Sequence, residues 1–424
     1  MTTQGQLLVE LHTTHQKQHI LGTDRATSLE NTLATITPLL PKMGITRIAN
    51  VTGLDTIGIP VVTVCRPLSK AVSVAQGKGA SLLAAKVSGV MEAIETYHAE
   101  TISLPLRYCS YKAISQYAQK HDALVIDADK LPKLRISEFD PSKQMLWIEG
   151  LELIRQKPIW LPYEVTHCDY SLPLPAGSGA FIMSTNGLAS GNNQLEAIVH
   201  AIYEVIERDA TSLWQLKPRD LINQTKIDLD SVDDPNCQEL IHKIKAAGID
   251  IAVWNTTTDI GIPCFYCTIM ASESDALRPL YPASGAGCHA DKRIALSRAI
   301  TEAAQTRLTQ ISGSRDDVSM HEYQAAQEAS YQQRISHWIT ATPPAQDFTT
   351  LSSWHNDTLN EDLTLQIQQL QAVGVTQIAT VDLRQSEFNI PVARVVIPGL
   401  EGIQDIPGYV QGTRATTQSQ QGSR

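Results

Sequence analysis

Apolar and polar residues follow one order at three places along the chain. Each copy reads as an amphipathic helix, a glycine, an apolar strand, a polar turn with an aspartate, and a second strand after Ile-Pro. Glycine just past a helix commonly ends it, and alternating apolar residues favour strands. Such units can look alike by chance, but three copies in the same order favour an internal repeat. We predict helix-hairpin units at residues 29–67, 237–271 and 362–399.

Three other segments combine a turn of small residues with a helix that is polar on one face. They cover residues 73–100, 184–210 and 284–308. Two of them directly follow a helix-hairpin unit, whereas the middle one stands alone. We predict that the three helices face one shared site. Mixed sheets with helices packed on them then give an α+β protein.

The middle segment has the most uneven distribution of charge. At about 100° per residue, Glu196, Glu204 and Glu207 lie within an arc of roughly 80°, together with His200. Ile202 and other apolar residues point the other way, into a core. Like charges at this spacing repel one another in a bare helix. We therefore expect this face to bind cations.

Glu196 has a second interpretation. It follows Asn193 by three residues, the spacing at which an N-cap residue and the third helical residue satisfy each other's backbone amides. The turn before this helix also offers free backbone amides, which favours an anion close by. The residues alone leave both roles of Glu196 open.

The two flanking helices add further polar groups. Ser88, Glu92 and Glu95 share one face of the first helix, and Lys78 lies between two glycines at its entrance, where a lysine can reach a phosphate. On the third helix one face carries Arg298, Glu302 and Gln305. Arg307 lies on nearly the opposite side of that helix, so geometry favours Arg298 over it.

Composition narrows the possible functions. The chain has 424 residues, 42% of them hydrophobic, and a net charge of −10 without a long basic run, which argues against nucleic acid as the main partner. No secretory signal and no membrane-spanning run is evident. We expect a surface insertion or linker at residues 313–357 and a disordered polar tail at 411–424.

Seven cysteines are scattered without a disulfide pattern, which is typical of a reducing cytoplasm. Cys264 and Cys267 form the one C-x-x-C, inside an apolar strand-like run. A zinc knuckle needs a second ligand pair at similar spacing, and none is evident. We expect both cysteines to be buried structural residues.

Clustered acids with basic residues around them suit a nucleotide held by more than one Mg²⁺, because magnesium prefers oxygen ligands and bridges carboxylates to phosphates. The chain contains no G-x-x-x-x-G-K-[ST], no kinase H-R-D or D-F-G set and no G-x-S-x-G. A nucleotide site of another kind is therefore predicted. The acids on the first two helices are Glu92, Glu95, Glu196, Glu204 and Glu207.

The same three segments resemble the ATP-binding motifs of the YcaO superfamily. They read SGVMEAIETYHAE, NGLASGNNQLEAIVHAIYEVIERDA and ALSRAITEAAQTRLTQISGSRDD, and the G-x-A-x-G-N turn with E-x-x-E-R-D is the most specific part. The resemblance covers roughly residues 20–410. It implies a YcaO-like fold of helix-hairpin units and mixed sheets that enclose an Mg-ATP site. The implied organisation is an N-terminal segment 1–20, a YcaO domain 21–410 and the tail 411–424.

The resemblance also implies roles for individual residues. It assigns no catalytic acid or base. A third-motif arginine, either Arg298 or Arg307, joins the phosphate contacts. The implied ATP contacts are Lys78, Ser88, Asn192, Glu196, Arg208, Arg298, Gln305 and Arg307. The implied Mg²⁺ ligands are Glu92, Glu95, Glu196, Glu204 and Glu207.

Proteins of this superfamily use ATP and Mg²⁺ to phosphorylate a peptide-backbone amide oxygen, after which a nucleophile attacks the amide carbon and phosphate leaves. The opening MGITRIANVTGLDTIGIPVV and the closing PGLEG look most like the branch that works with TfuA and makes backbone thioamides in a ribosomally synthesised peptide or a protein. We therefore expect a peptide or protein substrate, a TfuA-like sulfur-delivery partner and, by resemblance, a homodimer in the cytoplasm.

Two alternatives remain. One is an azoline-forming cyclodehydratase, but that branch typically ends in a proline-rich terminus, whereas this chain ends TTQSQQGSR. The other is a nucleotide-binding scaffold without turnover, which has no need of the full acid set. Under the thioamide interpretation we expect that deletion from Thr413 onward is harmless.

Overall fold

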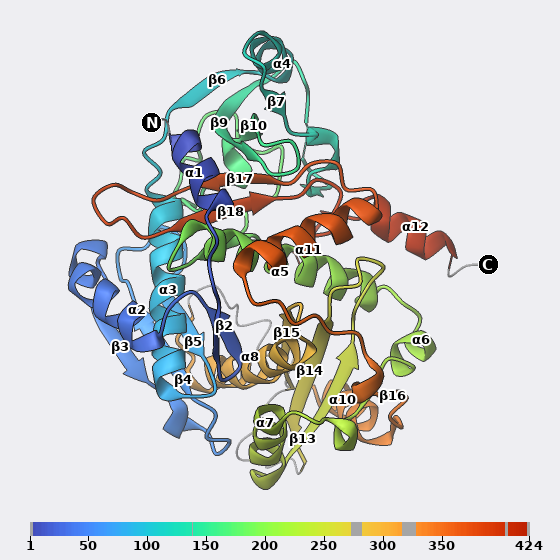
Figure 1. Ribbon diagram of the computed structural model, residues 1–424. Helices are drawn as coiled ribbons and strands as arrows, with labels where there is room; N and C mark the ends of the chain where they lie inside the picture. Colours follow the sequence, from blue (N-terminus) through green and yellow to red (C-terminus); the bar gives the residue numbers. More distant parts are fainter. Residues whose placement is uncertain (1–2, 138, 273–281, 316–327, 403–405, 422–424) are drawn as a thin grey trace.

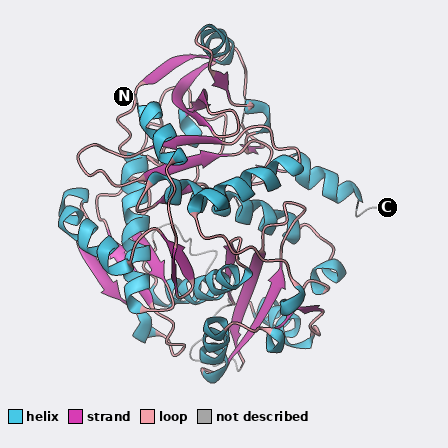
Figure 2. Cartoon of the chain, viewed as in Figure 1, coloured by secondary structure: helices cyan, strands magenta, loops and turns pink. Residues whose placement is uncertain are grey.

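Three units, each with three neighbouring antiparallel strands and one long helix, form the framework of the protein (Figure 1). The computed structural model describes residues 3–137, 139–272, 282–315, 328–402 and 406–421. Within these ranges helices pack on sheets whose strand pairs are mostly antiparallel, which confirms the predicted α+β class (Figure 2).

The first two units run in chain order. In each, a helix and a glycine precede a hairpin, a third strand pairs with the second strand, and a long helix then packs on the sheet. Unit one contains α2 (Leu29–Ile36), β3 (Arg47–Asn50), β4 (Val61–Cys65), β5 (Val74–Lys78) and α3 (Leu82–Glu100). Unit two contains α7 (Pro235–Ala246), β13 (Ile249–Asn255), β14 (Cys264–Ala271), β15 (Ala283–Cys288) and α8 (Lys292–Ser312).

The third unit has the same parts in a permuted order. Its last strand and long helix come first in the chain, and its helix-hairpin unit closes onto them about 170 residues later through β11–β18 pairing. The unit contains β11 (Leu188–Ser190), α5 (Gln194–Gln215), α11 (Leu359–Ala372), β17 (Ala379–Asp382) and β18 (Val392–Val396). The lone middle segment of the sequence therefore belongs to the third repeat.

Local chemistry explains why these elements begin and end where they do. Each of the three long helices starts at a side-chain N-cap: Ser81 accepts from Ala84, Asn193 from Glu196, and Asp291 from Arg293. The glycines that end the preceding helices have φ of 70°, 71° and 86°, in the left-handed region.

A glycine in the third strand lets the long helix approach the sheet closely. A Cβ added to Gly77 on β5 meets the carbonyl oxygen of Ala85 at 2.0 Å and the amide nitrogen of Gly89 at 2.1 Å. Any larger residue at Gly77 therefore pushes α3 away from its sheet. Since Lys78 follows directly, this contact also fixes one edge of the site described below.

The third unit extends into a seven-stranded sheet with the order β11-β18-β17-β9-β10-β7, and β6 also pairs with β9. The further strands of the described ranges are β1 (Gln18–Ile20), β2 (Thr23–Arg25), β6 (Leu106–Ser110), β7 (Leu124–Val125), β8 (Lys133–Leu134), β9 (Gln144–Glu152), β10 (Lys157–Pro162), β12 (Ile227–Asp228), β16 (Gln346–Asp347) and β19 (Tyr409–Val410). The further α-helices there are α1 (Thr3–His12), α4 (Tyr111–Lys120), α6 (Arg219–Asn223), α10 (Ala329–Ala341) and α12 (Thr413–Gln421).

The described helices nearest the two ends of the chain, α1 and α12, pack on the rest of the protein. In the N-terminal segment, Leu7 and Leu11 of α1 are buried in the same hydrophobic cluster as the apolar face of α5. The predicted disordered tail differs more strongly from the structure, because Thr413–Gln421 form helix α12. Arg414 anchors it to Asp209 of α5 at 3.1 Å and to Asp259 at 2.5 Å.

The predicted surface insertion is also only partly at the surface. Trp338 and Ile339 of α10 are buried. Trp338 stacks on Trp254 of β13 with ring centroids 4.0 Å apart, and Trp214 of α5 lies beside both rings. Because most of this segment is polar, its composition did not predict that these apolar side chains of α10 are buried. Residues 316–327 of the predicted insertion lie outside the described residues.

Cys264 and Cys267 are buried on β14, and all seven cysteines are free, as the interpretation of structural thiols requires. None of the helices in the described ranges is long and apolar enough to cross a lipid bilayer.

Candidate functional site

The three long helices α3, α5 and α8 meet around a cavity of about 520 Å³, and Figure 1 shows them converging at the centre of the molecule. This volume lies within the range of roughly 300–1,000 Å³ that is typical of small-ligand sites. The lining contains five carboxylates and five basic side chains, and we call it the charged cavity. The charged lining residues are Glu92, Glu95, Glu204, Glu207, Glu302, Arg25, Lys78, Arg208, Arg298 and Arg315.

Nine residues predicted from the sequence line this cavity. The shared site proposed for the three turn-helix segments therefore exists as a geometric feature. The nine are Lys78, Ser88, Glu92, Glu95, Glu204, Glu207, Arg208, Arg298 and Gln305.

Hydrogen bonds hold several of these groups in place. Glu95 accepts from the backbone amide of Ser190 at 2.9 Å and from its hydroxyl at 2.6 Å. This contact ties α3 to the end of β11. The Gln305 amide donates to the backbone oxygen of Gln76 at 2.8 Å, which ties α8 to β5. Lys78 of β5 forms an ion pair with Glu302 of α8, which joins the same two elements.

The acids of the charged cavity resist ionisation. Removal from water raises the pKa of Glu95 to about 8, and the hydrogen bonds from Ser190 offset this only in part. Removal from water likewise raises the pKa of Glu204 to about 7, against the pull of Arg208. The pKa values of Glu92 and Glu207 are also raised by desolvation. Bound cations stabilise the ionised forms of such acids.

Glu302 behaves differently from its neighbours. Desolvation opposes its ionisation, but Lys78 and Arg208 outweigh that effect, so its pKa is lowered. On α5, burial and the charge of Arg298 hold the pKa of His200 well below its usual value. The neutral imidazole can therefore accept at Nδ1 from Arg298, which lies 3.2 Å away. His200 thus orients an arginine rather than adding positive charge.

The acids form an open arrangement. Among the described residues, no three His, Cys, Asp or Glu side chains converge closely enough to hold a metal ion by themselves. The predicted Mg²⁺ ligands therefore lie further apart than a complete metal site requires. Mg²⁺ usually binds one or two carboxylates and completes its shell with water and substrate phosphates. The donor set fits Mg²⁺ that is shared with a nucleotide.

Glu196 and Asn192 lie beside the charged cavity and do not line it. The Glu196 carboxylate accepts from Arg25 at 3.2 Å, from the backbone amide of Ala26 at 3.1 Å and from Asn192. The Glu196 amide donates to Asn193 at 2.8 Å, as expected of a residue at a capped N-terminus. Asn193 thus caps the helix as predicted, but the Glu196 carboxylate accepts from the backbone amide of Asn192 and not from that of Asn193, so the described contacts form only half of the predicted capping box. The metal role of Glu196 stays a prediction. Asn192 also accepts from Thr32 at 2.8 Å.

Arg307 lies apart from this site. It forms a buried ion pair with Asp55, in the hairpin turn of unit one, at 2.8 Å. Both side chains are less than 5% exposed. Of the two alternatives for the third-motif arginine, the structure therefore places Arg298 at the charged cavity and gives Arg307 a contact between two units.

The structure adds residues that the sequence reasoning did not assign. Arg25 comes from the short hairpin before the first unit, and Arg315 follows α8. Arg25 lies outside the three motifs, so only the fold brings it to the site. Arg315 lies within the quoted third motif, SGSRDD, but after the helix, so the helical periodicity that pointed to Arg298 did not single it out. The sequence places Glu302 on the polar face of its helix, and in the structure its carboxylate lines the charged cavity.

Comparisons with known proteins agree with this site. The family model described as YcaO cyclodehydratase, ATP- and Mg²⁺-binding, matches residues 76–401. An uncharacterised protein in the tfuA 3′ region of Rhizobium leguminosarum bv. trifolii is 36% identical over 397 residues, 92% of each chain. An uncharacterised protein of Methanothermobacter thermautotrophicus is 32% identical over 367 residues, 85% of this chain and 91% of that one.

Solved structures share the fold at lower identity. YcaO from Methanopyrus kandleri, bound with AMPPCP and Mg²⁺, superposes with a TM-score of 0.74 and 19% identity over 94% of this chain and 99% of that one. A heterocyclase in complex with substrate and cofactor gives 0.75 and 21% over 92% of this chain, which spans about half (54%) of that protein. The family match covers all three helices of the charged cavity, and the chain belongs to the YcaO family of ATP- and Mg²⁺-binding proteins.

Proposed function

We propose that this chain uses ATP and Mg²⁺ to phosphorylate the oxygen of a backbone amide in a ribosomally made peptide or a protein, and that a sulfur nucleophile then replaces this oxygen. The carbon–sulfur bond forms as the carbon–oxygen bond to the phosphoryl group breaks, so phosphate leaves and a thioamide remains. The observation that carries the proposal is the charged cavity, in which the three motif helices bring acids and bases together.

The residues of the cavity have distinct tasks in this proposal. Glu92, Glu95, Glu204 and Glu207 hold Mg²⁺, which neutralises phosphate charge during transfer. Lys78, Arg208 and Arg298 contact the phosphates, while Ser88 and Gln305 fix the surrounding backbone and the nucleotide. Asn192 and Glu196 position the turn before α5. Preorganised charges of this kind stabilise a phosphoryl-transfer transition state without further rearrangement.

Two observations favour the thioamide branch. The relative from Rhizobium is encoded in the tfuA 3′ region, and this neighbourhood supports a TfuA-like protein as the sulfur donor of this chain. In addition, α12 docks on Asp209 and Asp259, and no described residue of 406–421 lines the charged cavity. The described part of the C-terminal region therefore packs away from the charged cavity.

A cyclodehydratase is the second candidate, because the matching family model carries that name. The two reactions share the activation step and differ in the nucleophile. An internal Cys, Ser or Thr of the substrate gives an azoline with net loss of water, whereas external sulfur gives a thioamide with exchange of oxygen for sulfur.

Mass spectrometry of cellular peptides and proteins tests the proposal. Cells that carry the TfuA-like protein are compared with wild-type chain, with Glu207→Gln and without the chain. We expect a species in which one sulfur replaces one oxygen, in the wild type alone. Glu387→Gln, on an exposed glutamate paired with Lys42, is the matched control and keeps the product.

The other results decide against the thioamide. Loss of water in place of sulfur exchange identifies a cyclodehydratase. If Glu207→Gln still forms the product, the charged cavity is not the site of the reaction. Absence of any product, although the purified chain binds Mg·ATP, identifies a nucleotide-binding scaffold.

A further inference from the structure

Each of the three long helices packs on a second unit besides its own. The sheet of unit one also contacts α8, the sheet of unit two also contacts α5, and strand β11 of unit three also contacts α3. The three units therefore close into a ring around the charged cavity. We call the contact between a long helix and the hairpin turn of the neighbouring unit a joint.

The three helices carry equivalent positions, counted from their N-caps. One acid of the charged cavity lies the same number of residues after the N-cap on every helix. These acids are Glu92, Glu204 and Glu302. A second equivalent position, further toward the C-terminus, faces the joint. It is occupied by Tyr97, Asp209 and Arg307. Because these side chains differ, each joint is held by a different contact.

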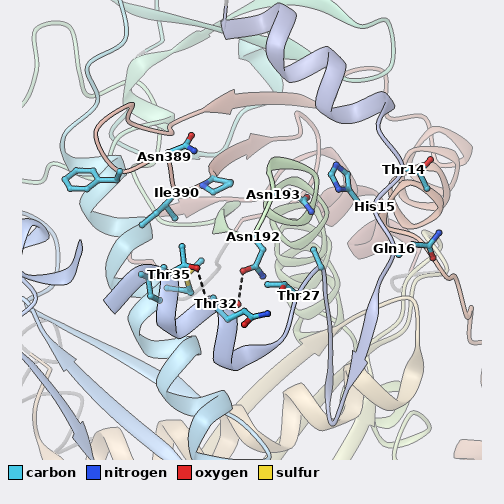
Figure 3. A pocket seen from close by; sticks show the side chains of 17 residues that line it. Thr14, His15, Gln16, Thr27, Thr32, Thr35, Asn192, Asn193, Asn389 and Ile390 are labelled. Atoms are coloured by element: carbon cyan, nitrogen blue, oxygen red, sulfur yellow. Dashed lines mark hydrogen bonds between the residues drawn. The ribbon is translucent and has the colours of Figure 1, made fainter. Parts of the chain in front are cut away.

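Two of the joints are direct contacts. Arg307 of α8 pairs with Asp55 in the hairpin turn of unit one at 2.8 Å. Tyr97 of α3 packs edge-on against Phe388 in the β17–β18 turn, with ring centroids 5.6 Å apart. Figure 3 shows the next residue of this turn, Asn389, at the pocket between α2 and the turn before α5. Complementary side chains thus meet in both joints.

The joint between α5 and unit two contains a third group. Asp209 of α5 and Asp259 of the β13–β14 turn are both acids, and Arg414 of α12 bridges them. Its Nε donates to Asp209 at 3.1 Å and its Nη2 to Asp259 at 2.5 Å. The Asp209 side chain is fully buried, so leaving it without a cation is costly. Arg414 therefore supplies the charge that Arg307 supplies in the α8 joint.

Asp209 connects this joint to the charged cavity. It directly follows Glu207 and Arg208 on α5, and both of these line the cavity. Arg298 and Glu302 line it from α8, which packs on β15 of unit two. A shift of α5 against unit two therefore changes the distances between the two sets of groups. Mg²⁺ demands nearly ideal octahedral geometry, and small misplacements of reacting groups are costly.

We infer that Arg414 is a positioning residue, which holds α5 against unit two and so keeps the α5 groups of the charged cavity in place relative to those of α8. Arg414 itself is not among the residues that line the cavity, so it acts through Asp209. This inference rests on the proposed function in one respect, because it needs Mg·ATP in the charged cavity. It holds for either nucleophile that follows.

Calorimetric titration of Mg·AMPPCP into Arg414→Ala tests this role. We expect the affinity to fall on the order of tenfold in protein that circular dichroism shows to be folded. The matched control on the same helix is Gln418→Ala. Gln418 donates to the backbone oxygen of Leu213 on α5 at 2.7 Å, so its loss weakens the docking of α12 but keeps the bridge. We expect Gln418→Ala to bind Mg·AMPPCP as the wild type does.

Two further variants separate positioning from stability. The double variant Asp209→Arg/Arg414→Ala moves the arginine to the position that Arg307 has on α8, with Asp259 of the hairpin turn opposite. We expect it to bind Mg·AMPPCP within about threefold of the wild type. Asp259→Ala breaks the bridge at its exposed end, where the carboxylate is 61% exposed and folding is least affected. We expect it to lose affinity by about threefold.

Wild-type affinity in folded Arg414→Ala overturns the inference. A loss in Gln418→Ala as large as in Arg414→Ala also overturns it, because docking of α12 and not the bridge then matters. A folded double variant that binds as weakly as Arg414→Ala contradicts the positioning role. If either Arg414 variant does not fold, wild-type affinity in Asp259→Ala overturns the inference. A wild-type chain that does not bind Mg·AMPPCP contradicts the proposed function, and this inference with it.

Discussion

Two arginines on α8 show how much a single residue's surroundings decide its role. Arg298 and Arg307 both fit the third sequence motif, yet they lie on different faces of the helix. Arg298 contacts neutral His200 in the charged cavity, whereas Arg307 is buried against Asp55. The helical periodicity in the sequence already favoured Arg298. Asp55, the partner of Arg307, belongs to a different unit, so local sequence patterns could not predict this ion pair.

Alanine substitutions separate the two roles. Arg298→Ala weakens Mg·ATP binding by about tenfold or more, while the free energy of unfolding changes by less than about 1 kcal/mol. Arg307→Ala leaves Asp55 buried without its partner and lowers the free energy of unfolding by about 3–5 kcal/mol. Denaturant titrations and calorimetry measure both quantities. A stable Arg307→Ala that has lost nucleotide binding reverses this assignment.

Glu95 and Glu204 make the site sensitive to pH. Their pKa values in the folded protein are about 8 and about 7, above the ordinary value of 4.5. The folded state therefore holds more protons than the unfolded state, and without metal its stability falls as pH rises from about 4.5 to about 8. Mg²⁺ needs the ionised carboxylates, so its affinity rises over the upper part of this window.

Thermal melts with and without Mg²⁺ at about pH 6 and about pH 8.5 test this dependence. We expect the rise in Tm on adding Mg²⁺ to be larger at the higher pH, and Glu95→Gln to reduce that difference. An equal rise at both pH values means that these carboxylates do not bind the ion.

Elements were predicted well where local patterns decide them. The three helix-hairpin units, their terminating glycines and the three turn-helix segments all appear as predicted. Their arrangement was less accessible, because the third unit closes between β11 and β18, which are far apart in the chain. No local pattern encodes which strand pairs with a lone turn-helix segment.

The C-terminal tail is the clearest failure at this scale. Its composition predicts disorder, yet α12 forms because Arg414 reaches Asp209, whose side chain is fully buried. Burial raises the pKa of Asp209 to about 6 even with Arg414 beside it. Glu401 also accepts from the backbone amides of Gly412 and Ala415, and Gln418 donates to the backbone oxygen of Leu213. Several tertiary contacts thus outweigh the polar composition of the segment.

Removing this anchor tests the role of the tail. Arg414→Ala leaves Asp209 buried with the backbone amide of Glu401 as a remaining donor, and we expect a loss of about 3 kcal/mol in the free energy of unfolding at pH 8. The loss is smaller near pH 5, where Asp209 takes up a proton. This revises the expectation that deletion from Thr413 is harmless.

Asp259→Ala is the control for this change, because that carboxylate is 61% exposed and its pair with Arg414 contributes less than about 1 kcal/mol. Denaturant titration at both pH values gives the comparison. Equal, small effects of the two substitutions contradict the anchoring role of Arg414.

At the scale of the whole molecule, three repeated units place one helix each around a common centre. Acids from α3, α5 and α8 and bases from segments as distant as Arg25 and Arg315 meet in the charged cavity. The family match and this geometry support one account, in which Mg·ATP binds at the centre of the three units.

The central claim is that the charged cavity binds Mg·ATP, and isothermal titration calorimetry tests it most directly. ATP is titrated with and without Mg²⁺ into the wild-type chain, Glu207→Gln and the surface control Glu387→Gln. The account predicts Mg²⁺-dependent binding by the wild type and by Glu387→Gln, and binding weakened by at least about tenfold in correctly folded Glu207→Gln. Equal Mg²⁺-dependent binding by Glu207→Gln and the wild type contradicts the assignment of the charged cavity as the Mg·ATP site.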